Sequence, residues 1–265
     1  MMIDLHTHIL PGFDDGPASS EESLAMLRQA ADQGITELVA SPHVMKGSYD
    51  HTPESIARGV AELQALAQAA GIPVKLHVGG EVYLDFDVLE AAKEQRAITL
   101  GAGRYVLLEF PAMGLPQGMD EIVFELQIRG YHPILAHPER NLDIINKPSL
   151  LYELVYKGVL VQQNAGALLG YFGNSVREVA RLFLEHHLVH AVASDAHDAR
   201  QRTFCQREWV ALATPLLGAD NVAQLTTTVP GAIIRGEEVD FNEPLQLVEG
   251  GWLQDLRQWW RRRAQ

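Results

Sequence analysis

The chain is poor in cysteine and has no long apolar run. Cys205 is the only cysteine among 265 residues, so no disulfide can form within the chain. That composition fits a reducing cytoplasm. No apolar run approaches the ~20 residues that a membrane-spanning helix needs. The N-terminus lacks a basic region followed by an apolar signal segment. These absences predict a soluble, cytoplasmic protein.

Positive charge is also scarce. The chain has 21 Lys and Arg residues against 34 Asp and Glu residues, which gives a net charge of −13. The main body has no basic surface of the kind that nucleic-acid binding requires, so no nucleic-acid partner is expected. The one basic cluster is RQWWRRRAQ at the end of the chain. Apolar residues make up 47% of the sequence, enough for a large buried core.

Short apolar runs alternate with helix-like stretches along the chain. The runs are MIDL (2–5), ELVAS (37–41), VKLHVG (74–79), YVLLEF (105–110), PILAH (133–137), VLVQQN (159–164) and VHAVAS (189–194). Seven strands separated by helices imply parallel pairing, because each crossover needs a helix's length of chain. We expect an α/β fold with a closed or nearly closed barrel of seven or eight units. An open doubly wound sheet is the alternative.

Two histidines end the first of these strands. His6 and His8 are separated by one residue, and residues i and i+2 of a strand point to the same face. Neutral imidazole is a common metal ligand, so a pair of imidazoles projecting together at a strand end indicates a metal site. The motif alone is weak evidence.

Acidic or histidine side chains follow most of the other strands. They are His43 in SPH, Glu81 in VGGEV, Glu109 in LLEF, His137 in LAHPER, and Asp195 and His197 in VASDAH. The sixth strand is the exception, since it ends in Gln163 and Asn164, which are poor metal ligands. Any one of these residues alone would be taken as solvated or as a helix cap. Because parallel barrels carry their active sites at this end of the strands, the joint pattern predicts a metal centre.

The motifs DLHTHILPGFDDGP, SPH, GGEVY, LLEF, AHPER and SDAH resemble the polymerase and histidinol phosphatase (PHP) superfamily. Within it they resemble the bacterial metal-dependent tyrosine phosphatases of capsule and exopolysaccharide gene clusters. The resemblance implies a catalytic domain over residues 1–235, folded as a PHP-type distorted (β/α)7 barrel that is TIM-barrel-like. It also implies three divalent metal ions. Their ligands would be His6, His8, Asp15, His43, Glu81, Glu109, His137, Asp195 and His197.

The resemblance also assigns roles around the metals. A hydroxide that bridges two ions would attack phosphorus, with Arg140, Asp15 and His43 as catalytic residues. Arg140 matches the family's phosphate-contacting arginine, and either Arg200 or Arg202 would supply a second one. Lys46, in the loop after the second strand, is a further candidate for substrate contact. Imidazole and carboxylate ligands suit Mn²⁺, with iron or zinc as alternatives.

The implied activity is hydrolysis of protein phosphotyrosine. The expected partner is a membrane-associated bacterial tyrosine kinase that controls capsule or exopolysaccharide synthesis. Alternatives are a histidinol-phosphate type of phosphatase, a nuclease, a metal amidohydrolase and a binding module that has the fold without activity. The acidic composition weighs against a nuclease, and the complete ligand set weighs against a binding module. Cys205 stands in CQREWVA, without the C-x5-R of cysteine phosphatases.

Residues 236–265 form a C-terminal extension. Within 252–265, Trp252, Leu256 and Trp259 recur at helical spacing beside four arginines, which predicts an amphipathic helix. Such a helix could lie on the anionic inner face of the cell membrane. Packing of the same stripe on the barrel or on a second subunit of a homo-oligomer is the alternative.

Overall fold

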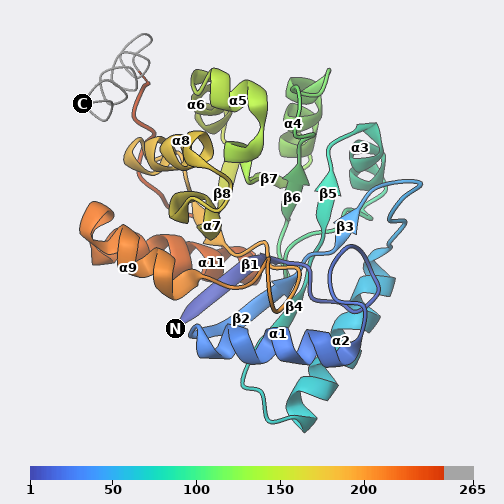
Figure 1. Ribbon diagram of the computed structural model, residues 1–265. Helices are drawn as coiled ribbons and strands as arrows, with labels where there is room; N and C mark the ends of the chain where they lie inside the picture. Colours follow the sequence, from blue (N-terminus) through green and yellow to red (C-terminus); the bar gives the residue numbers. More distant parts are fainter. Residues whose placement is uncertain (248–265) are drawn as a thin grey trace.

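The computed structural model describes residues 1–247, in which parallel strands alternate with helices (Figure 1). The expected α/β class is confirmed. The amphipathic helix expected over 252–265 lies outside the described residues. The division of the chain near residue 235 stays a prediction.

The strands form two parallel sheets. One sheet has the order β1-β2-β4, and the other has the order β3-β5-β6-β7-β8-β9. The strands are β1 (Met2–Thr7), β2 (Ile35–Ala40), β3 (His43–Val44), β4 (Lys75–Val78), β5 (Glu81–Tyr83), β6 (Tyr105–Glu109), β7 (His132–Ala136), β8 (Leu160–Asn164) and β9 (Ala191–Ala193).

The second and third expected strands are each broken in two. β2 gives way to β3 across Ser41 and Pro42, and β4 gives way to β5 across Gly79 and Gly80. A Cβ on Gly79 would lie 2.4 Å from a methyl carbon of Val39, so only glycine fits this close approach. The sequence does not predict β3 and β5 as separate strands, because two or three residues are too few to show an alternation of polar and apolar side chains. Their pairing places two candidate ligands opposite each other, His43 beside Glu81.

The chain after β9 returns to β1 and joins the two sheets. Thr7 and Ala196 form a parallel bridge. The amide N–H of Asp195 donates to the carbonyl of His6, and the N–H of His8 donates to the carbonyl of Ala196, both at 2.9 Å. These bonds close the ring of strands, in place of the open sheet considered as the alternative.

Helices surround the strands (Figure 1). The longer ones are α1 (Ser20–Asp32), α2 (Pro53–Ala69), α3 (Phe86–Lys93), α4 (Met119–Ile128), α6 (Ser149–Tyr156), α8 (Asn174–Glu185) and α9 (Gln206–Leu217). The shorter ones are η1 (Pro138–Arg140), α5 (Leu142–Asn146), α7 (Ala165–Leu169), α10 (Ala219–Ala223), η2 (Gln224–Thr228) and α11 (Val229–Arg235). The starts of α1 and α2 are capped by the side chains of Ser19 and Thr52.

The core has two clusters. The larger lies between strands and helices, and the smaller joins inward residues such as Leu5, Leu107 and Ile134 to Ile233 of α11. After α11, residues 236–247 run back to α8, where the N–H of Leu245 donates to the carbonyl of His186. Within residues 1–247, no helix combines the length and apolar character needed to cross a membrane.

Candidate metal centre

The structure brings all nine predicted metal ligands into one cluster at the carboxyl ends of the strands. His6 lies in β1 and His8 directly follows it, and His43, Glu81 and Glu109 come from β3, β5 and β6. The others follow β7 and β9 or lie in the loop after β1; they are His137, Asp195, His197 and Asp15.

Three overlapping groups within the cluster have their candidate ligand atoms within 4.8 Å of one another. The groups are His8, Asp15, His43 and His197; His6, His8 and Glu81; and His43, Glu81 and Glu109. His8, His43 and Glu81 each belong to two groups, as ligands shared between neighbouring cations would.

Glu81 lies at the centre of the cluster. Its Oε2 is 3.3 Å from Nε2 of both His6 and His8, and 3.0 Å from Nδ1 of His43. Its Oε1 is 2.9 Å from Nε2 of His137. Oε2 is buried yet has no hydrogen-bond partner among the described residues. An orphaned carboxylate oxygen that faces several imidazole nitrogens fits a bound cation.

When neutral, three histidines of the cluster carry their proton on Nδ1 and keep the Nε2 lone pair for a cation. Nδ1 of His6 faces the Oε1 of Gln162 at 2.8 Å, and Nδ1 of His8 faces Asp14 Oδ2 at 2.6 Å. Nδ1 of His197 faces the carbonyl oxygen of Asp195 at 2.9 Å. Because all three partners are acceptors, each Nδ1 carries the proton. Such bonds fix the orientation of metal-ligating imidazoles, so these residues fit a metal centre.

Two candidate ligands hold an uncommon backbone conformation. His137 and Asp195 have φ angles of 31° and 54°, in the left-handed region that residues other than glycine seldom adopt. His137 directly follows β7, and Asp195 is the second residue after β9. Strained backbone of this kind concentrates at functional sites.

The charged groups of the cluster shift one another's pKa values. Burial alone would raise the pKa of Glu81, but the surrounding histidines, led by His6, hold it well below its usual range. Burial alone would lower the pKa of His43, but hydrogen bonds to Glu109 and Glu81 raise it to about 10. Protons therefore compete with cations for these imidazoles.

Two side chains that hold metal ligands in place were not predicted, because the sixth expected strand ends in residues that are poor metal ligands. Gln162 binds His6, and its amide nitrogen donates to Oδ1 of Asn164 at 2.9 Å. Asn164 Nδ2 in turn donates to Asp195 Oδ2 at 2.8 Å. Gln163 lies on the other face, bonded to the carbonyl of a helix residue. Strand alternation could have separated Gln162 and Asn164 from Gln163.

Asp14 supports two of the histidines. Its Oδ2 accepts from Nδ1 of His8 and from the backbone N–H of His43 at 3.0 Å, while its Oδ1 accepts from the N–H of Gly16 at 2.9 Å.

A second acid, Glu139 of the HPER motif, is fully buried and accepts from the N–H of Asn164. Burial raises the pKa of Glu139 to about 7.

Two arginines reach the cluster. Arg140 Nη1 lies 3.0 Å from Asp195 Oδ2. Arg202 Nη1 and Nη2 each lie 3.3 Å from a carboxylate oxygen, of Asp15 and Asp195 respectively. Of the two alternatives left by the sequence, Arg202 contacts the cluster, whereas the exposed Arg200 has no side-chain bond to it. Arg140 and Arg202 therefore both lie at the edge of the cluster.

Lys46 does not join the cluster. Its Nζ is exposed and lies 2.8 Å from Asp87 Oδ1 of α3. It lines a separate surface cavity of about 500 Å³ together with Tyr49 and Arg96. The ring of Tyr49 does stack on His43, with centroids 5.6 Å apart. Substrate contact by Lys46 stays a prediction.

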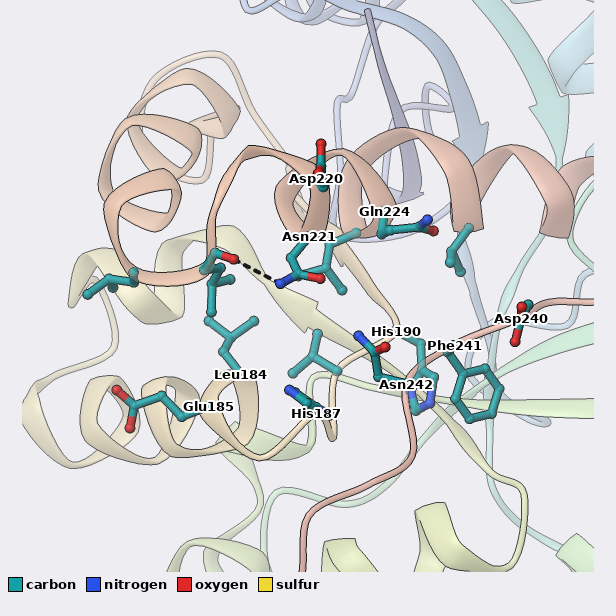
Figure 2. A pocket seen from close by; sticks show the side chains of 15 residues that line it. Leu184, Glu185, His187, His190, Asp220, Asn221, Gln224, Asp240, Phe241 and Asn242 are labelled. Atoms are coloured by element: carbon teal, nitrogen blue, oxygen red, sulfur yellow. Dashed lines mark hydrogen bonds between the residues drawn. The ribbon is translucent and has the colours of Figure 1, made fainter.

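Another cavity, of about 480 Å³, lies away from the metal cluster (Figure 2). It is lined by the end of α8, by α10 and η2, and by residues 240–242. His190, at the start of β9, is buried there beside Phe241, and burial lowers its pKa to about 3. No predicted metal ligand lies among the described residues that line it. Because it is at the opposite end of β9, it is not the candidate active site.

Comparisons with known proteins agree with this geometry. The family described as "Capsular polysaccharide synthesis, CpsB/CapC" matches residues 2–235. The tyrosine-protein phosphatase YwqE of Bacillus subtilis is 34% identical over 94% of this chain and 97% of its own length. The putative tyrosine-protein phosphatase CapC of Staphylococcus aureus is 36% identical over 78% of this chain and 81% of its own.

Solved structures agree as well. One that reports YwqE and the CpsB of Streptococcus pneumoniae as metal-dependent tyrosine phosphatases superposes with a TM-score of 0.89 at 33% identity, covering 94% of this chain and all of that one. A lactonase of Listeria monocytogenes shares the fold alone, with a TM-score of 0.59 at 14% identity over 89% of this chain and 95% of its own. On the family match and these relatives, the chain belongs to the CpsB/CapC family of capsular polysaccharide synthesis proteins.

Proposed function

We propose that this chain hydrolyses phosphotyrosine in proteins, with divalent metal ions bound at the carboxyl ends of its strands. The observation that carries the proposal is the convergence of imidazole lone pairs and carboxylate oxygens on one pocket, with two arginines at its edge. The activity agrees with that of the relatives described as metal-dependent tyrosine phosphatases.

The proposed ligands are the nine clustered residues, shared among three ions. Mn²⁺ suits this mixture of imidazole and carboxylate donors, and iron and zinc are alternatives. When bound, such ions activate water near neutral pH and neutralise charge on a phosphoryl group. Asp15 is the most exposed of the carboxylates, with 47% of its side chain accessible. It is therefore the ligand that faces arriving substrate.

Arg140 and Arg202 hold the phosphate in this proposal. A guanidinium presents a planar fork of donors that matches two phosphate oxygens. Each now contacts Asp195, which is buried, so both are positioned before substrate arrives. Their positive charge offsets the repulsion between a phosphate group and this negatively charged protein.

The leaving group needs little help. The phenol of tyrosine has a pKa near ~10, so its anion leaves more readily than an alkoxide. A cysteine nucleophile has no place here, because Cys205 is buried and burial raises its pKa to about 12. The proposed substrate is a membrane-associated bacterial tyrosine kinase of capsule or exopolysaccharide synthesis, met at the cytoplasmic face of the membrane.

The test is a substrate panel with chelated and manganese-reloaded protein. The panel holds a phosphotyrosine peptide, the matching phosphoserine peptide, histidinol phosphate and an oligonucleotide. We expect hydrolysis of the phosphotyrosine peptide that disappears on chelation and returns with Mn²⁺, and the same behaviour in Cys205→Ser. Full activity without metal, or preference for histidinol phosphate, would refute the proposal. An inactive but folded Cys205→Ser would restore a cysteine mechanism.

A further inference from the structure

An exposed aromatic pair stands beside the metal centre. Tyr171 and Phe172 lie in the turn between α7 and α8, which follows β8 (Figure 1). Tyr171 is 62% exposed and Phe172 is 39% exposed. Large apolar side chains left exposed at the rim of a pocket often serve binding.

The backbone holds this pair rigidly. Gly170 and Gly173 bracket it with φ angles of 87° and 92°, conformations that favour glycine. The N–H of Tyr171 donates to the carbonyl of Gly166, and the N–H of Gly173 donates to the carbonyl of Gly170. A Cβ on Gly166 would lie 2.9 Å from the Tyr171 ring and 3.4 Å from the Phe172 ring, so both rings sit close on α7. The rings therefore have a fixed place.

Phe172 is in direct contact with the proposed phosphate clamp. The guanidinium carbon of Arg140 lies 5.1 Å from the centre of the Phe172 ring, within range of a cation–π contact. The same Arg140 reaches Asp195 in the cluster. A phosphate held by Arg140 would therefore carry its organic group past the exposed part of Phe172.

Other apolar groups extend this rim. Leu142 is 47% exposed and Met113 is 75% exposed, and the N–H of Leu142 donates to the carbonyl of Ala112. A small cleft of about 40 Å³ is lined by Arg140 and by Ala112 and Asn141, the chain neighbours of Met113 and Leu142. Exposed apolar side chains thus lie close along the chain to the lining of the cleft beside Arg140, where an aromatic group would gain more from apolar contact than a hydroxylated alkyl group.

We propose that Phe172, supported by Tyr171, forms an aromatic subsite that receives the phenyl ring of an aryl phosphate and so selects phosphotyrosine over phosphoserine. This inference rests on the proposed function, because it names the group that selects the substrate at the same site. An aromatic pair contributes enough to change affinity by ~2- to 12-fold.

The test compares aryl and alkyl ligands of Phe172→Ala. We expect the KM for a phosphotyrosine peptide to rise ~2- to 12-fold, with kcat nearly unchanged, while the KM for the matching phosphoserine peptide stays constant. Phe172→Tyr should restore the wild-type KM. Tyr156→Ala is the matched control, since Tyr156 is 76% exposed at the far end of α6.

A binding measurement separates this inference from the proposed function. Calorimetry on the manganese-loaded protein should show weaker binding of benzylphosphonate in Phe172→Ala and unchanged binding of propylphosphonate. Equal losses for both phosphonates would mean that Phe172 acts only through Arg140, and no loss would mean that it touches no ligand; either result overturns the subsite. If the wild type left phosphotyrosine intact, the proposed function would fail while the phosphonate comparison still decided the subsite.

Discussion

Replacing Asp14 by asparagine should weaken metal binding although Asp14 is not a proposed ligand. Its two oxygens accept three hydrogen bonds, from Nδ1 of His8 and from the N–H groups of His43 and Gly16. Asparagine has one oxygen and one NH₂ group. In either orientation the NH₂ group therefore faces at least one N–H donor.

The size of the effect follows from those bonds. Removing a partner that orients a metal-binding histidine costs about 10- to 100-fold in metal affinity, which corresponds to about 1.4–2.7 kcal/mol. We expect the Kd for Mn²⁺ to rise by that factor in Asp14→Asn, with activity recovering at high Mn²⁺ because the ligands themselves remain. Burial alone would raise the pKa of Asp14, but its interactions with His8 and the backbone hydrogen bonds from Gly16 and His43 together lower it, so the carboxylate is charged at neutral pH in the native enzyme.

The assay is a Mn²⁺ titration followed by calorimetry and by activity on the same preparations. Asp87→Asn is the matched control, because Asp87 is an exposed aspartate that pairs with Lys46 away from the cluster. Equal Mn²⁺ affinity in Asp14→Asn and wild type would refute the reasoning, since it would show that His8 and His43 need no support from Asp14. Activity that never recovers at saturating Mn²⁺ would give Asp14 a more direct role.

Two further predictions concern phosphate binding and pH. Arg202→Ala should lower kcat/KM by about 10²–10³-fold, as loss of a well-placed donor does, whereas Arg200→Ala should stay near wild type; similar losses in both variants would contradict the contact of Arg202 with Asp195. In chelated protein the pKa of His43 is raised from 6.5 to about 10, so its stabilising contribution is present below pH 6.5 and is lost as pH rises towards 10. His43 should therefore raise the thermal midpoint of the chelated protein less at pH 9 than at pH 6.5. His43→Ala should weaken the dependence of the thermal midpoint on pH. An equal pH dependence in the variant and the wild type would contradict this prediction.

The sequence predicts the strand ends well because their chemistry is unusual. His6, His8 and Asp195 stand in motifs whose spacing puts their side chains on one face. The sequence also predicts α1 and α2, since serine and glutamate begin the first, Pro53 begins the second, and Gly34 and Gly71 follow them.

What the sequence leaves open depends on contacts between distant segments. The choice between Arg200 and Arg202 is set by where a surface loop folds back over Asp15. The role of Gln162 depends on the contact of its side chain with His6, which lies 156 residues away along the chain. The breaks that make β3 and β5 separate strands come from close approaches such as that of Gly79 to Val39. None of these distances can be read from local pattern.

Because the strands are divided between two sheets, metal ions bound at this centre would hold the two sheets together. His6 lies in β1 and His8 directly follows it, whereas Asp195 and His197 follow β9 of the other sheet. Ions held by both sets would tie β1 to the chain after β9, which within residues 1–247 meet through the bridge between Thr7 and Ala196 and a few hydrogen bonds. At a free metal concentration 100 times Kd, binding adds about 2.7 kcal/mol to the free energy of unfolding. Loss of metal would then destabilise this enzyme first between β1 and the chain after β9. The backbone N–H groups of His8 and Asp195, which bond across this junction, should be the first to exchange their hydrogens with solvent.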